Sequence, residues 1–197
     1  MTSPPRTVYF NTHPDVLIDP AEPVTDWRLS PAGRARMTAA LARPWLAGVR
    51  TIWCSTERKA RDGADILAKH FGLPVTELAA LGENDRSATG YLPRAEFEAL
   101  ADAFFARPQE SVRGWERAID AQHRIVAAVE TVLTASAGSA GDIAIVAHGG
   151  VGTLLLCHLR GMPIGRRHDQ PPNNGGNYFV FDAVTRRVRH GWTAIDA

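Results

Sequence analysis

The sequence contains few cysteines and no long hydrophobic run. Its 197 residues include only Cys54 and Cys157, which both lie in apolar stretches. They predict small core residues rather than a disulfide, and this cysteine use fits a reducing compartment. No apolar run approaches the length of a membrane span, and no apolar segment follows a basic start. We therefore expect no membrane contact and no signal peptide, and we place the protein in the cytoplasm.

The sequence also lacks an excess of charge of either sign. A formal net charge of +1 provides no strong basic field, so we expect no nucleic-acid partner. The hydrophobic fraction of 45% and the charged fraction of 22% are typical of a globular protein. The length predicts a single domain over residues 1–197, with a lid-like insert at about 84–111 that contains Gly90, Pro93 and Pro108.

Apolar segments of strand length alternate with segments of helical periodicity. The predicted strands cover 7–10, 49–54, 75–81 and 142–147, and 178–181 with 188–193 forms a C-terminal hairpin. Helices are predicted from Ser30 onward, from the Ser55–Lys59 loop to Phe71, and over 94–105, 112–135 and 151–159. This alternation predicts an α/β fold with three layers, α/β/α, around a mostly parallel sheet.

Local residues support two of these helices directly. Ser30 is a good N-cap and Pro31 suits the first helical position, while Met37 and Trp45 continue an apolar face at helical spacing. The long helix over 112–135 has an apolar stripe that begins at Trp115.

Polar loops follow the predicted parallel strands. In such sheets the ligand crevice lies outside the carboxyl ends of the strands. This rule selects Asn11–Asp15, Ser55–Lys59, Gly82–Asp85 and His148–Gly150. Together these loops contain two histidines, two cations and several acids, so they predict one site.

The residue types in these loops suit an anionic substrate, above all a phosphate. A neutral histidine can attack phosphorus through one ring nitrogen while the other donates to the backbone. A second histidine and nearby cations would stabilise the equatorial oxygens, and the backbone N–H groups of Gly149 and Gly150 would add to that site. An acid such as Glu83 could protonate the leaving oxygen. Taken alone, His13 between Thr12 and Pro14 also fits an ordinary turn.

Several segments together resemble the histidine phosphatase superfamily, which includes the phosphoglycerate mutases. They are a strand followed by His13, then "LSPAGRARM", "IWCSTERKARDGADILAKHFGLP", "LGEND" and "IAIVAHGGV", and they span nearly the whole chain. The resemblance implies a phosphoglycerate mutase-like fold and a phosphohistidine intermediate. It places the phosphorylated histidine at His13, the second histidine at His148 and the proton donor at Glu83.

The first motif departs from the family pattern. Where the family has Arg-His-Gly, this chain has Thr12, His13 and Pro14, and the arginine of the second motif is Lys59. Each lost bidentate pair would remove roughly 1.5–3 kcal/mol of phosphate binding. Arg58 and Arg86 are the two candidates to replace the missing guanidinium.

The resemblance implies a phosphohydrolase that acts on a small phosphorylated substrate. The alternative is a catalytically impaired relative that binds a phosphorylated or anionic ligand, which the altered first motif favours. We expect no cofactor and no metal site, because no HExxH or close histidine pair occurs. The edge strand of the C-terminal hairpin leaves a homodimer open.

Overall fold

One six-stranded sheet forms the centre of the computed structural model, which describes residues 6–197. The strands are β1 (Thr7–Thr12), β2 (Val49–Cys54), β3 (Val75–Glu77), β4 (Asp142–Ala147), β5 (Asn177–Asp182) and β6 (Val188–Ala194). They lie in the order β3-β2-β4-β1-β5-β6. The first four run parallel, and β5 is antiparallel to both β1 and β6. The predicted mostly parallel sheet and the C-terminal hairpin are confirmed.

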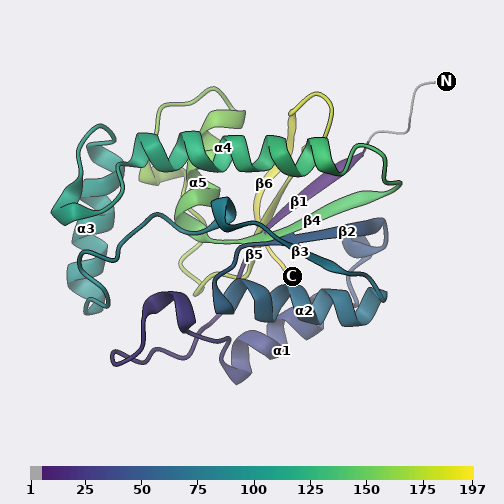
Figure 1. Cartoon of the computed structure of the whole chain (residues 1–197), viewed down its shortest axis with the longest axis horizontal. Helices are drawn as coiled ribbons and strands as arrows, with labels where there is room; N and C mark the ends of the chain where they lie inside the picture. The colour runs from purple at the N-terminus through teal and green to yellow at the C-terminus, as the bar shows by residue number, and fades with distance from the viewer. Residues whose placement is uncertain (1–5) are drawn as a thin grey trace.

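Helices cover both faces of the sheet, as the three-layer prediction required (Figure 1). The helices are α1 (Pro31–Ala40), α2 (Arg58–Phe71), α3 (Arg94–Ala106), α4 (Ala118–Ala135) and α5 (Gly149–Leu159). In Figure 1, α1 and α2 lie below the sheet and α4 and α5 above it. Helix α3 stands apart, at the end toward which the parallel strands point.

Strand β4 shows why both faces must be covered. Ile143 and Ile145 belong to the core cluster under α4 and α5, whereas Ala144 and Val146 belong to the cluster under α1 and α2. Successive side chains of a strand point to opposite faces, so a continuous apolar run needs a layer on each side.

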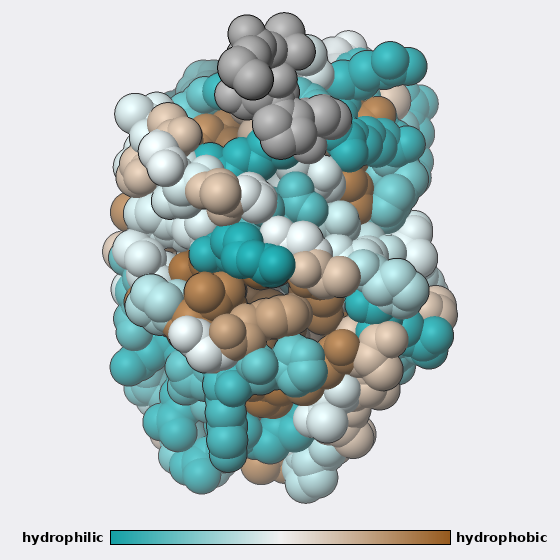
Figure 2. Space-filling view, turned by 90° about the vertical axis from the view of Figure 1, so that its right-hand side faces the viewer, coloured by the Kyte–Doolittle hydropathy of each residue, from teal (hydrophilic) through white to brown (hydrophobic). Residues whose placement is uncertain are grey.

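Figure 2 shows the end of the molecule that lies opposite α3, where hydrophilic side chains surround a central apolar patch. No helix of residues 6–197 is long and apolar enough to cross a membrane.

The predicted helix start at Ser30 is confirmed. Its Oγ accepts a 3.0 Å hydrogen bond from the Gly33 N–H, and Pro31 is the first residue of α1. Helix α1 is shorter than the apolar spacing predicted. It ends at Ala40, and Trp45 lies in a separate 3-10 turn, Pro44–Leu46. Proline cannot continue a helix, since it lacks the N–H donor.

Three further boundaries correct the prediction. The third strand ends at Glu77 and is followed by a 3-10 turn, Ala79–Leu81. The long helix begins at Ala118 rather than at 112, because Arg113 and Gly114 have positive φ angles of 49° and 81°. Trp115 therefore lies outside the helix, although it is buried as the apolar stripe predicted. Helix α5 begins two residues earlier than predicted, at Gly149.

Candidate active site

Two histidines meet where the two central parallel strands end. His13 follows β1 and His148 follows β4, and these strands pair with Thr12 opposite Ala147. The backbone N–H of His13 donates to the Ala147 carbonyl at 3.1 Å. The two rings consequently lie edge to face, with 5.2 Å between their centroids. The sheet thus joins residues that are separated by most of the chain.

The hydrogen bond of His13 defines which ring nitrogen can react. Nδ1 lies 2.9 Å from the carbonyl oxygen of Pro14, and because a carbonyl can only accept, Nδ1 carries the hydrogen. Burial, and then the charge of Lys59, lowers the pKa of His13 to about 4. At neutral pH the ring is therefore uncharged, with its lone pair on Nε2. Proline lacks a backbone N–H donor but keeps its carbonyl acceptor, so Pro14 can hold the His13 ring in this way.

His148 is fully buried and is held by the loop after β2. Its Nε2 lies 2.9 Å from Ser55 Oγ and 3.3 Å from Glu57 Oε1. Burial, and then His13, lowers the pKa of His148 well below its ordinary value, so this ring is also neutral. Its Nδ1 has no hydrogen-bond partner within residues 6–197. A buried polar atom without a partner is unusual and marks a place where a ligand atom can bind.

The second-motif cation is paired inside the chain. Lys59, only 3% exposed, donates from Nζ to the Val24 carbonyl at 2.7 Å and to Glu57 Oε2 at 2.5 Å. The other carboxylate oxygen of Glu57 accepts the Glu83 N–H at 2.8 Å. The sequence interpretation did not assign Glu57 a role. Its place between Ser55 and Lys59, in a loop already selected, was the available signal.

Glu83 binds the N-terminus of α5. Its carboxylate accepts the N–H of Gly150 at 3.1 Å and the N–H of Val151 at 2.9 Å. Burial raises the pKa of Glu83, but Arg86, His148 and the Gly150 N–H together hold it below its ordinary value. Glu83 is thus ionised and occupies part of the helix N-terminus that the sequence interpretation assigned to a phosphate.

Thr12 organises a neutral part of the site. Its hydroxyl donates to Gln170 Oε1 at 2.8 Å and accepts the Asn177 N–H at 3.0 Å. Gln170 in turn lies against Gly149, where an added Cβ would sit 2.3 Å from the amide nitrogen. A larger residue at position 149 would therefore displace the Gln170 side chain. Gln170 carries no sequence signal of its own, because it belongs to a proline- and asparagine-rich loop far along the chain.

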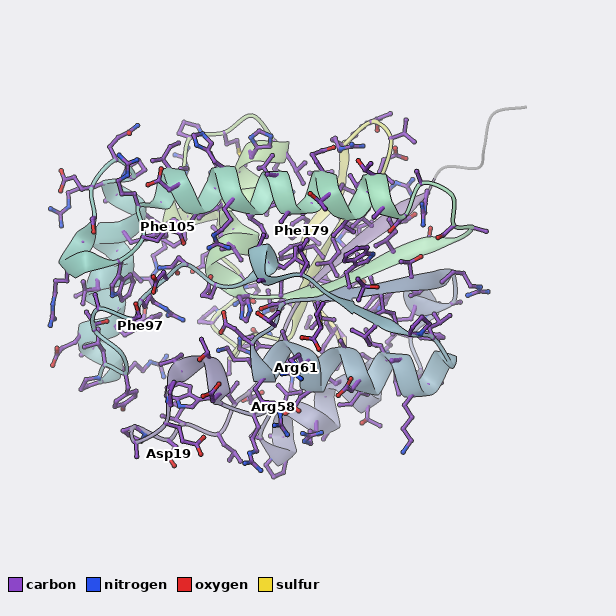
Figure 3. All side chains as sticks on the ribbon, in the orientation of Figure 1. Asp19, Arg58, Arg61, Phe97, Phe105 and Phe179 are labelled. Atoms are coloured by element: carbon purple, nitrogen blue, oxygen red, sulfur yellow. The ribbon has the colours of Figure 1, made fainter. Side chains whose placement is uncertain are left out.

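The two candidate replacement arginines lie in different places. Arg58 is half-exposed on α2 and pairs with Asp62 at 3.1 Å, near α1, so the structure does not bring it to the cavity (Figure 3). Arg86 lines the cavity together with His13 and Glu83. Its guanidinium carbon lies 5.1 Å from the ring centre of Phe97 and 5.7 Å from that of Trp115.

A cavity of about 670 Å³ opens beside His13. One end is polar and contains Glu83, Asn84, Gly149 and Gln170, and the other is formed by α3 and by aromatic side chains. Asn84 is 6% exposed, and in the described chain its Nδ2 has no hydrogen-bond partner. The sequence interpretation quoted this asparagine within "LGEND" but assigned it no role.

The charges of the inner site nearly cancel. Glu57 neutralises Lys59, Glu83 lies near Arg86, and both imidazoles are uncharged at neutral pH. No group of three His, Cys, Asp or Glu side chains in residues 6–197 is arranged to hold a metal ion. The chemistry that this arrangement supports is nucleophilic attack by a neutral imidazole beside a second one.

The family model for "Histidine phosphatase superfamily (branch 1)" matches residues 20–194. The chain belongs to this superfamily. The match covers the second motif, the Glu83 loop and His148, and it begins seven residues after His13, beyond the first motif. The sequence has no significant match among curated proteins.

Solved structures of several other proteins share the fold. A mycobacterial glucosyl-3-phosphoglycerate phosphatase in complex with inorganic phosphate is 20% identical, with a TM-score of 0.74 and coverage of 98% of this chain and 99% of that one. YhfR from Bacillus stearothermophilus is 21% identical, with a TM-score of 0.75 and coverage of 94% and 95%. A putative alpha-ribazole-5'-P phosphatase from Escherichia coli is 15% identical, with a TM-score of 0.69 and coverage of 96% and 97%. These similarities confirm the phosphoglycerate mutase-like fold.

Proposed function

We propose that this histidine phosphatase superfamily member is a phosphohydrolase acting through a phosphohistidine at His13. The observation that carries the proposal is the complementary pair of imidazoles. His13 Nδ1 is tied to the Pro14 carbonyl and His148 Nε2 to Ser55 Oγ, so His13 Nε2 and His148 Nδ1 remain for the substrate. The rings lie 5.2 Å apart, which is close enough to share one phosphoryl group.

In the first step, His13 Nε2 forms a bond to phosphorus while the bond from phosphorus to the ester oxygen breaks. Arg86 and His148 Nδ1 bind phosphoryl oxygens. Glu83 takes up a proton from solvent as the phosphoryl group binds and delivers it to the leaving oxygen. A phosphoryl dianion placed next to it raises its pKa by like-charge repulsion, opposing the helix N-terminus and Arg86.

In the second step, water attacks the phosphohistidine and gives its proton to Glu83. The bond between His13 Nε2 and phosphorus breaks, and inorganic phosphate leaves. Thr12 and Lys59 act on the geometry of the site rather than directly on phosphate. Thr12 orients Gln170, and Lys59 is held by Glu57. The substrate is a small phosphorylated molecule, with no cofactor in the reaction.

The charge balance of the site favours a second candidate function. With Lys59 neutralised by Glu57, this protein would bind a phosphorylated or anionic ligand without hydrolysing it.

The experiment that separates the two functions compares wild-type protein and His13→Ala on an aryl phosphate from about pH 5 to about pH 8. Exposed His123 on α4, changed to Ala, is the matched control. Turnover and an acid-labile phosphohistidine that disappear only in His13→Ala support the enzyme. Their absence from the wild type, with ligand binding retained, supports the second candidate.

A further inference from the structure

We infer that the cavity accepts the phosphate ester of a bulky aromatic alcohol, with the ring system packed against α3. This inference rests on the proposed phosphatase activity, because it places the phosphoryl group at His13. The cavity volume of about 670 Å³ lies within the range of pockets that enclose whole organic ligands. A phosphoryl group at the polar end leaves most of that space for the alcohol.

The α3 wall of the cavity is rich in aromatic side chains, of which Phe104 and Phe105 are largely buried, and it also carries Arg94 and Glu98. Helix α3 turns one face to the cavity, with lining positions at helical spacing: Arg94, Phe97, Glu98, Ala101, Phe104 and Phe105. Figure 3 labels Phe97 and Phe105 on this helix. Trp115 packs against Phe97 and Phe104, with ring centres 5.9 Å and 6.2 Å apart. Trp27 and Tyr91 form a second aromatic pair, 5.9 Å apart, in the same cavity.

Exposed apolar side chains concentrate at this cavity. Four large hydrophobic residues of the described chain are exposed: Leu17, Ile18, Tyr91 and Val184. Ile18, 60% exposed, and Tyr91, 37% exposed, line the cavity, and Leu17 precedes Ile18. Large apolar side chains left in water around a concave site indicate a ligand with an apolar surface.

Arg86 lies where the aromatic wall meets the polar end. Its guanidinium stacks over Phe97 and Trp115, and its charge acts on Glu83. A phosphate ester with a flat ring system matches this order of groups, with the anion at Arg86 and the ring beyond it. Hydroxyl groups of a highly hydroxylated alcohol would lose hydration against these rings without gaining hydrogen bonds from them. Two of the charged residues in the same lining, Arg166 and Glu98, are already paired with each other.

The test compares two primary alkyl phosphates with similar leaving groups, naphthylethyl phosphate and hydroxyethyl phosphate. We expect wild-type kcat/KM to favour the naphthylethyl ester by about 100-fold. Phe97→Leu and the exposed-site variant Tyr91→Ala should each lower that preference by about tenfold through a loss on the naphthylethyl ester. Phe71→Leu, on α2 and outside the cavity, is the matched control and should keep the wild-type preference.

Equal kcat/KM values for the two esters would overturn the inference while leaving the phosphatase proposal intact. If neither ester is hydrolysed, turnover of the aryl phosphate decides the phosphatase proposal, and calorimetric binding of the two alkyl esters decides the inference. Binding of the naphthylethyl ester at least about tenfold more tightly, lost in Phe97→Leu, supports it. Equal affinity for both compounds overturns it.

Discussion

Glu57 Oε2 lies 2.5 Å from Lys59 Nζ, so the buried cation of the second motif is already paired within the chain. The same carboxylate also contacts His148 and the backbone of Glu83. Buried ion pairs gain little net stability, because desolvation offsets their attraction. Under the proposed function, this pair withholds positive charge from a phosphate bound beside the histidines.

Glu57→Gln should strengthen phosphate binding. The amide can still accept from Lys59, but the ammonium is no longer neutralised. We expect the inhibition constant of inorganic phosphate to fall by about tenfold, with some loss of stability from the unpaired charge. Glu77→Gln on β3, which removes an exposed partner of Arg61, is the control. An unchanged inhibition constant in Glu57→Gln would show that pairing with Glu57 is not what keeps the charge of Lys59 from phosphate.

Glu83→Gln should remove the proton donor and weaken the cap of α5. The two N–H groups of Gly150 and Val151 bind different oxygens of Glu83, so the amide NH2 would replace one acceptor and face a donor there. We expect kcat to fall by about 100-fold or more for alkyl phosphates, and less for a nitrophenyl ester whose leaving group needs no proton. Asp85→Asn, at an exposed position two residues away, should leave both rates near the wild-type values. Equal losses on both esters would argue against general-acid catalysis by Glu83.

Arg86→Met should weaken phosphate binding, whereas Arg58→Met should not. Arg86 lines the cavity, while Arg58 is half-exposed and paired with Asp62 on α2. Loss of a charge-assisted contact to phosphate predicts a rise of about tenfold or more in the inhibition constant. The inhibition constant of inorganic phosphate, determined as a competitive inhibitor, is compared between the two variants. A larger effect from Arg58→Met would reverse the assignment.

Acid should destabilise the protein through His13. In the unfolded chain this histidine gains a proton below about pH 6.5, whereas in the fold its pKa is about 4. The unfolded state therefore binds more protons in this window, and the free energy of unfolding falls as the pH falls. The contribution of His13 is about 2 kcal/mol between pH 7 and pH 5.

His13→Asn should be correspondingly less sensitive to acid. Urea unfolding at about pH 7 and about pH 5 measures the difference, with His123→Asn as the control at an exposed site. The same loss of stability in His13→Asn and in the wild type would show that the folded pKa of His13 is not depressed.

The elements with strong local signals were predictable. Ser30 and Pro31 start α1 because capping needs only neighbouring residues, and β4 is an apolar run of strand length. Elements whose ends depend on backbone conformation were not. The start of α4 is set by positive φ angles at Arg113 and Gly114, and periodicity cannot detect these.

The sequence by itself determined the α/β class and the loops that form the site, because strand polarity places those loops at one edge of the sheet. It also placed His13 and His148 in that set. Only the tertiary structure decided which groups remain available to a ligand. Glu57 pairs with Lys59, Glu83 binds the α5 N-terminus, and Arg86 rather than Arg58 reaches the cavity. Those outcomes depend on contacts between side chains distant in sequence and on their burial, which residue order alone does not specify.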